Sequence, residues 1–130
     1  MTTAIRPATM ADLPALMAIY NHAVVHTTAI WNDAVADLAN RRAWYEARRK
    51  VGYPVLVAEV DGIVAGYGSF GDFRAFEGYR FSVEHSVYVA ETMRRQGIAS
   101  RLLEALVEEA RRIGKHVMIA GVAADNDASI

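Results

Sequence analysis

The turn Arg94-Arg95-Gln96-Gly97 contains residue types suited to binding an anion, and it joins a predicted strand to the start of a predicted helix. The first N–H groups of a helix have no partner within it, and the helix dipole adds partial positive charge there. Gly97 and Ala99 are small enough for a phosphate to approach the backbone. The predicted diphosphate site comprises Arg94, Arg95, Gln96, Gly97, Ile98, Ala99 and Ser100.

Two common phosphate-binding motifs do not match this turn. No glycine is followed by Lys-Ser or Lys-Thr, as in a P-loop, and the three-glycine spacing of the dinucleotide fingerprint is missing. A strand, turn and helix with arginine and glycine at the turn also occur in many α/β proteins that bind no ligand. The turn alone therefore leaves a ligand site and a purely structural connection as open alternatives.

The composition limits the classes of function. The chain has 130 residues, of which 53% are hydrophobic, enough for one domain with a core. Its 14 basic and 15 acidic residues give no electrostatic field that favours nucleic acid or an anionic membrane as partner.

There is no cysteine, and His22, His26 and His116 lack metal-ligand spacing, so we expect no metal. The sequence shows neither a signal peptide nor a membrane span, and we expect a cytoplasmic protein.

Hydrophobic periodicity predicts an α/β chain with a mixed sheet. The first predicted helix starts at Thr9 or Asp12 and ends near His26. The second runs from Val35 to Lys50, and the third runs from Ile98 to Ile113. We expect the second helix to bury Leu38, Trp44 and Tyr45 and to expose Arg41, Arg42, Arg48 and Arg49. The predicted strands are residues 3–6, 55–60, 63–70, 81–89 and 117–122, the last of them buried. Asp61-Gly62 predicts a hairpin, and the crossover through the third helix predicts a parallel pair.

The motif Arg-x-x-Gly-x-Ala at residues 94–99, after Val-Tyr-Val and before a Leu-Leu helix and an Asn-x-x-Ser, resembles the acetyl-CoA motif of the GNAT superfamily of N-acetyltransferases. More narrowly, five segments are similar to its phosphinothricin and methionine sulfoximine acetyltransferase subgroup. These are residues 20–24, 30–32, 52–54, 69–74 and 83–89. The resemblance covers essentially the whole chain. It implies a mixed, mostly antiparallel sheet with a splayed parallel pair, flanked by helices.

The resemblance also implies how acetyl-CoA is held. In this superfamily the strand before the phosphate turn is splayed from its parallel neighbour, and the pantetheine arm lies in the gap. Here that strand is Val87-Tyr88-Val89, whose backbone groups would hydrogen-bond pantetheine and polarise the thioester carbonyl as an oxyanion hole does. Asn126 matches a cofactor-contacting position, although a plain helix cap is an equally good role for it.

Attack on a thioester requires a neutral amine, whereas an α-amine with a pKa of about 8 is mostly protonated near neutrality. Glu84 matches the proposed base of the family and stands just before the thioester-binding strand. An exposed strand carboxylate with no catalytic role is the alternative. His85 faces the other side of the sheet if strand pairing is regular, but a bulge would allow it to carry the proton instead.

Arginine suits the acid group of a zwitterionic substrate, because its guanidinium donates two parallel hydrogen bonds. Arg74 and Arg80 match the Phe-Arg and Tyr-Arg pairs of the subgroup, although a loop arginine is usually only a surface residue. Nearby aromatic residues would form walls of the pocket, or belong to the core or a subunit contact. The expected substrate-binding residues are Arg74, Arg80, Phe73, Tyr79, Trp31 and Glu84.

The implied function is an acetyl-CoA-dependent, homodimeric enzyme that acetylates an amino-acid-like molecule such as phosphinothricin, methionine sulfoximine or methionine sulfone. The alternatives are a non-catalytic acyl-CoA-binding regulatory module and an acetyltransferase for protein N-termini or aminoglycosides. A polycationic substrate favours an acidic cleft, whereas the loop here supplies arginines.

Residues 125–130 are typical of the start of another helix. We therefore expect residues 1–130 to be one domain truncated before its last helix and strands, and the acid for the coenzyme A thiolate to lie beyond residue 130.

Overall fold

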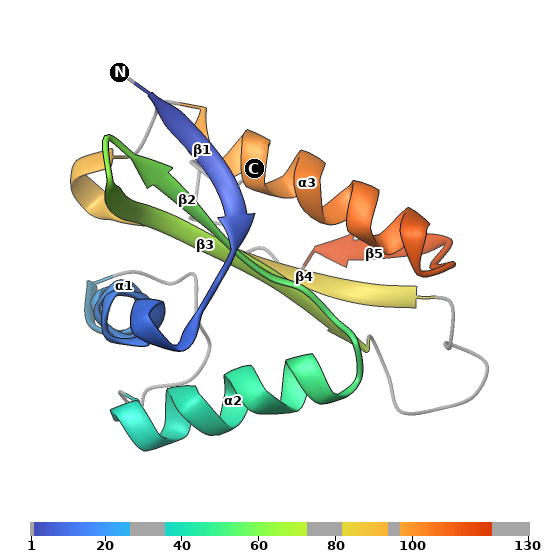
Figure 1. Cartoon of the computed structure of the whole chain (residues 1–130), viewed down its shortest axis with the longest axis horizontal. Coiled ribbons are helices and arrows are strands. Elements are labelled where there is room, and N and C mark those ends of the chain that lie inside the picture. The colour runs from blue at the N-terminus through green and yellow to red at the C-terminus, as the bar shows by residue number, and fades with distance from the viewer. Residues whose placement is uncertain (1, 27–35, 73–81, 94–96, 121–130) are drawn as a thin grey trace.

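The computed structural model describes residues 2–26, 36–72, 82–93 and 97–120. In these residues one sheet lies between two layers of helices (Figure 1). Its strands, in sheet order, are β1 (Thr3–Pro7), β2 (Val55–Val60), β3 (Ile63–Asp72), β4 (Ser82–Val89) and β5 (Val117–Ala120). The helices are α1 (Leu13–His26), α2 (Leu38–Lys50) and α3 (Ile98–Arg112), with short 3₁₀ turns η1 (Met10–Asp12) and η3 (Glu91–Met93). None of the helices in these ranges is long and apolar enough to cross a membrane.

The sheet is antiparallel except for its last pair, in which β4 and β5 run parallel from Ser82 beside Val117 to His85 beside Ala120. The mixed sheet predicted from the sequence is therefore confirmed. The β2–β3 hairpin turns at Asp61-Gly62, where both residues have positive φ, as a tight hairpin turn requires. A shift of the β2–β3 register between Ala58 and Glu59 was not predicted by the alternating pattern.

Two hydrophobic clusters lie on the two faces of the sheet. On one face, α3 places one residue from each successive turn against the strands, namely Ile98, Leu102, Leu106 and Ala110. These residues pack with Ala58, Phe70 and Val83. On the other face, the cluster beneath α1 and α2 includes Leu13, Leu16, Ile19, Tyr45, Val55, Val57 and Tyr67. Figure 1 shows α3 separated by the sheet from α1 and α2.

Some predicted element boundaries need correction, and β3 continues to Asp72 rather than ending at residue 70. Helix α2 begins at Leu38 rather than Val35, because Asp37 caps it and accepts a hydrogen bond from the N–H of Asn40 at 2.7 Å. Strand β5 contains residues 117–120 of the predicted 117–122, and residues 121 and 122 lie outside the described part. Val117 is 50% exposed, so the prediction of a buried strand is wrong for its first residue.

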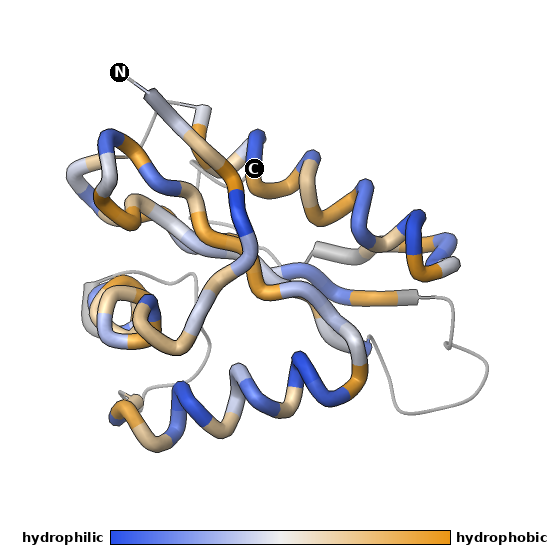
Figure 2. The backbone as a smooth tube through the Cα atoms, viewed as in Figure 1, coloured by the Kyte–Doolittle hydropathy of each residue, from blue (hydrophilic) through white to orange (hydrophobic). Residues whose placement is uncertain are grey.

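The predicted exposed face of α2 is wrong for two of its arginines. Arg41 is only 8% exposed, with its guanidinium 4.1 Å from the ring centre of Tyr20 and 4.9 Å from that of Trp44. Arg48, two turns further along, is partly buried, whereas Leu38 is 46% exposed. Figure 2 shows how hydrophilic this helix is although it packs on the sheet. A planar guanidinium can be buried against aromatic rings. The polarity of an arginine therefore did not indicate whether it lies on the buried or the exposed face of α2.

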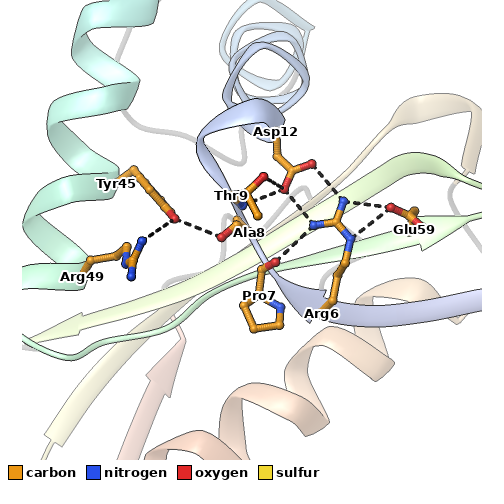
Figure 3. Close-up of polar contacts among 8 residues, drawn as sticks. All are labelled: Arg6, Pro7, Ala8, Thr9, Asp12, Tyr45, Arg49 and Glu59. Carbon is orange, nitrogen blue, oxygen red and sulfur yellow. Dashed lines mark hydrogen bonds and ion pairs between the residues drawn. The ribbon is translucent and has the colours of Figure 1, made fainter.

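Polar contacts fix the start of the chain to the sheet (Figure 3). Arg6 of β1 lies between the carboxylates of Asp12 in η1 and Glu59 in β2. The hydroxyl of Tyr45 in α2 donates to the carbonyl of Ala8 at 3.0 Å. These contacts hold the segment that leads into α1 against both the sheet and α2.

Candidate active site

Glu84 lies on β4 directly opposite Gly71 of β3. The β3–β4 pairing has no register shift from Val83 to Val89, so successive side chains alternate between the two faces. Val83 belongs to the cluster beneath α3, and Tyr88 packs against the cluster beneath α1 and α2. Glu84 therefore shares the α1–α2 face with Tyr88. Its side chain is exposed, which leaves the carboxylate accessible to a ligand.

His85 points to the opposite face of the sheet, as expected for regular pairing. It is half-buried, and burial lowers the pKa of its imidazole, while the negative charge of Glu84 acts in the opposite direction. Nδ1 of His85 is buried and has no hydrogen-bond partner among the described residues. These features favour a neutral imidazole that faces away from the Glu84 carboxylate.

The strand Val87-Tyr88-Val89 pairs with β3 along its whole length. On the side of β5, the described pairing ends where His85 meets Ala120. The side chains of Val87 and Val89 pack toward the α3 cluster. Tyr88 packs on the other face, with its ring 5.1 Å from that of Tyr67 and 6.0 Å from that of Tyr20, and burial raises its pKa. Side-chain packing thus holds this strand from both faces.

Gly97 precedes the first turn of α3 with a left-handed backbone (φ 76°), a conformation that glycine adopts at little cost. The first intrahelical hydrogen bond in this turn runs from the N–H of Arg101 to the carbonyl of Gly97. The N–H groups of Ile98, Ala99 and Ser100 precede this bond and have no acceptor within the helix. They are therefore the groups that can donate hydrogen bonds to a ligand. Ile98 is 2% exposed and serves the core, whereas Ala99 and Ser100 are exposed.

Nine of the predicted site residues lie outside the described part of the chain. These are Trp31, Phe73, Arg74, Tyr79, Arg80, Arg94, Arg95, Gln96 and Asn126. The structure describes the other predicted residues, which fall on β4 and at the start of α3. It brings Glu84 and the Val87–Val89 backbone onto one strand, and Gly97 follows that strand after η3.

The sequence analysis missed Arg48 and Gly71 as parts of this region. A Cβ atom built on Gly71 would lie 1.9 Å from Nη1 of Arg48, so the guanidinium occupies the place of a side chain opposite Glu84. The seven-residue spacing of Arg41 and Arg48, with Trp44 between them, was the one available signal. It places the three residues on the same face of a helix.

Comparison with known proteins agrees with this geometry. Residues 16–130 match the profile of the acetyltransferase (GNAT) family. This chain belongs to the GNAT acetyltransferase family. The resemblance noted in the sequence is thereby confirmed, and the sheet and helices described above are those of a GNAT acetyltransferase.

Individual GNAT relatives are similar over nearly all of the chain. The L-methionine sulfoximine/L-methionine sulfone acetyltransferase of Salmonella typhimurium is 58% identical over 97% of this chain and 74% of its own length. A Salmonella typhimurium protein solved with its cofactor acetyl-CoA is 56% identical, with a TM-score of 0.95 over 99% of this chain and 75% of that one. A phosphinothricin acetyltransferase of Sinorhizobium meliloti, solved with acetyl-CoA, is 32% identical, with a TM-score of 0.94 over 99% and 70%.

Proposed function

We propose that this chain transfers the acetyl group of acetyl-CoA to the α-amino group of a small L-amino acid, with methionine sulfone and methionine sulfoximine as the first candidates. The observation that carries the proposal is the 58% identity, over 97% of the chain, with an enzyme named for those two substrates. The exposed carboxylate of Glu84 on β4 agrees with it. Phosphinothricin, the substrate named for a relative at 32% identity, is the second candidate.

The residues that would hold acetyl-CoA are those of β4 and the start of α3. The edge of Val87–Val89 away from β3 has backbone groups for the pantetheine arm. The amides of Ile98, Ala99 and Ser100 suit the diphosphate, and Gly97 turns the chain so that these amides open the helix. We assign Arg94, Arg95, Gln96 and Asn126 to the same cofactor by their place in the motif.

Acetyl-CoA supplies an activated acetyl group, and the proposed task of Glu84 is to accept a proton from the substrate amine. The amine nitrogen then bonds to the acetyl carbon and the carbon–sulfur bond breaks. The acylated nitrogen loses a proton, which balances the one that the sulfur takes up as coenzyme A leaves as a thiol. Backbone N–H groups of Val87–Val89 would stabilise the charge that grows on the carbonyl oxygen. The orientation of His85 to the other face supports Glu84 as the base.

The loop between β3 and β4 supplies the other proposed substrate contacts. Arg74 and Arg80 would bind an acid group of the substrate such as the phosphinate of phosphinothricin, and Phe73, Tyr79 and Trp31 would form apolar walls. In the described residues β3 ends at Asp72, and β4 begins at Ser82, two residues before Glu84. The position of the loop at the end of the strands that carry Gly71 and Glu84 supports the assignment.

We further infer a cytoplasmic homodimer. The absence of cysteine from the chain is compatible with a reducing compartment. Size-exclusion chromatography with light scattering would measure the mass of the assembly, and a monomeric mass at micromolar concentration would contradict the dimer.

The deciding experiment is release of coenzyme A thiol from acetyl-CoA with a panel of amines. We expect turnover with methionine sulfone and methionine sulfoximine, and little with aminoglycosides or N-terminal peptides. Calorimetry with acetyl-CoA alone provides the control. Cofactor binding without turnover of any amine would favour the regulatory module instead.

A further inference from the structure

Helix α2 directs the guanidinium groups of Arg41 and Arg48 toward the sheet. Nε of Arg48 is buried and has no hydrogen-bond partner among the described residues. In the same part of the chain, neither arginine forms an ion pair with a carboxylate. Buried arginines in folded proteins are normally paired, because removing a charge from water is costly. The inner face of α2 therefore holds positive charge that makes no direct ion pair with a described carboxylate.

Gly71 defines where the Arg48 guanidinium lies. A Cβ at position 71 would be 1.9 Å from Nη1, 2.7 Å from Cζ and 2.9 Å from Nη2 of Arg48. Gly71 is paired with Glu84, and directly opposed residues on antiparallel strands have their Cβ atoms on one face, about 5 Å apart. The guanidinium of Arg48 thus lies beside Glu84 on the α1–α2 face of the sheet.

Asp72, the acidic residue next to Gly71, does not occupy this position. Alternation along β3 directs its side chain to the opposite face, where its carboxylate accepts a hydrogen bond from the hydroxyl of Tyr53. Burial lowers the pKa of Arg48, the charge of Asp72 is the next largest influence and raises it, and the charge of Arg41 has a smaller lowering effect. An anion that bound beside Gly71 would offset both unfavourable effects.

We propose that Arg48 binds the α-carboxylate of the substrate while Glu84 faces its amino group. The inference rests on the proposed function and names the residue that selects α-amino acids. Only two bonds separate the amine nitrogen of an α-amino acid from its carboxyl carbon, so the two groups can meet a carboxylate and a guanidinium that lie side by side. The guanidinium can donate two parallel hydrogen bonds to the carboxylate, and a cation–π contact with Trp44, 5.7 Å from Cζ to the ring centre, helps to orient it.

The test compares two substrates in each variant, L-methionine sulfone and its carboxamide, which keeps the amine but has no carboxylate. In Arg48→Met we expect kcat/KM for the acid to fall about 10- to 100-fold, mainly through KM, because a charge-assisted hydrogen bond is lost. The value for the carboxamide should stay within about twofold. Arg42→Met is the matched control, since Arg42 is an exposed arginine of the same helix that pairs with the exposed Glu46.

Gly71→Ala provides an independent test, because the new methyl group would displace the Arg48 guanidinium. We expect the same selective loss for the acid, and little further loss when Gly71→Ala is added to Arg48→Met. If Arg48→Met does not fold, Arg48→Lys takes its place. Lysine keeps the charge without the two-pronged donor, so the ratio of acid to carboxamide kcat/KM should still fall.

The outcomes separate this inference from the proposed function. If the wild-type chain acetylates neither the acid nor the carboxamide, the proposed function fails and the role of Arg48 fails with it. If the wild type acetylates methionine sulfone and the folded variants keep the wild-type ratio of acid to carboxamide, only the role of Arg48 is overturned. An equal loss for both substrates would likewise make Arg48 a structural residue.

Discussion

The carboxylate of Asp12 receives two hydrogen bonds from the guanidinium of Arg6, from Nη1 at 2.8 Å and from Nη2 at 2.9 Å. The backbone N–H of Thr9 donates to the same carboxylate at 2.7 Å. Glu59 accepts from Arg6 as well, so this contact joins β1, η1 and β2 (Figure 3). The hydrogen bonds from Arg6, above all, lower the pKa of Asp12 from 3.8 to about 2.

We expect this contact to make stability depend on acidity. Because the folded pKa of Asp12 is below the unfolded one, its contribution is complete above the unfolded pKa of 3.8 and disappears as the pH falls through about 2. The shift corresponds to about 2 kcal/mol of unfolding free energy. Urea unfolding of wild type and Asp12→Asn should show this difference at about pH 6 and roughly half of it at about pH 3. Glu108→Gln, which breaks an exposed pair with Arg111, should change little at either pH.

The elements of the fold could be predicted from the sequence where the signals are local. The Asp61-Gly62 turn and the apolar stripe of α3 each depend on residues within a few positions of one another. The parallel pairing of β4 with β5 followed from the length of the connection through α3. These features required no knowledge of distant contacts.

The left-handed backbone at Gly97 leads to a prediction with an internal control. Gly97→Ala should lower stability by about 1 kcal/mol and weaken acetyl-CoA binding, because it strains the turn that presents the first amides of α3. Gly114 at the other end of α3 has a similar φ, 84°, and at both glycines a built Cβ has no atom within 4 Å other than those of the glycine and its chain neighbours. Gly114→Ala should therefore lower stability equally and leave cofactor affinity unchanged. Thermal melts and calorimetry measure the two effects, and equal affinity losses in both variants would contradict the assignment.

Two other glycines on β3 differ in what lies beside them. A Cβ on Gly66 would be 2.8 Å from the backbone carbonyl oxygen of Tyr88, whereas a Cβ on Gly68 would meet the side chains of Leu106 at 3.0 Å and Val87 at 3.3 Å. Side chains can shift more easily than a paired strand. We expect Gly66→Ala to be the more destabilising change and also to raise KM for acetyl-CoA, since it moves the backbone proposed to bind pantetheine. Denaturant unfolding and steady-state kinetics check both points, and a larger effect from Gly68→Ala would contradict them.

The site was less predictable than the fold, because its decisive contact joins residues distant in sequence. Polarity placed Arg48 on the exposed side of α2, yet its guanidinium lies against Gly71, and no local pattern connects a helix residue with a strand residue 23 positions later. Trp44 and Tyr20 bury Arg41 in the same way. Stacking on aromatic rings and the lack of a side chain at position 71 become visible only when α2 is packed on the sheet.

The neighbouring residues Glu84 and His85 offer the sharpest test of the proton acceptor, since they face opposite sides of the sheet. Glu84→Gln should lower kcat about 10²- to 10⁴-fold near neutral pH, the range typical of a lost general base. The deficit should shrink as the pH rises above about 8, because the amine then loses its proton without help. His85→Gln should retain most of the activity, and both variants should bind acetyl-CoA normally by calorimetry. The reverse pattern, an active Glu84→Gln beside an inactive His85→Gln, would place the proton path on the α3 face.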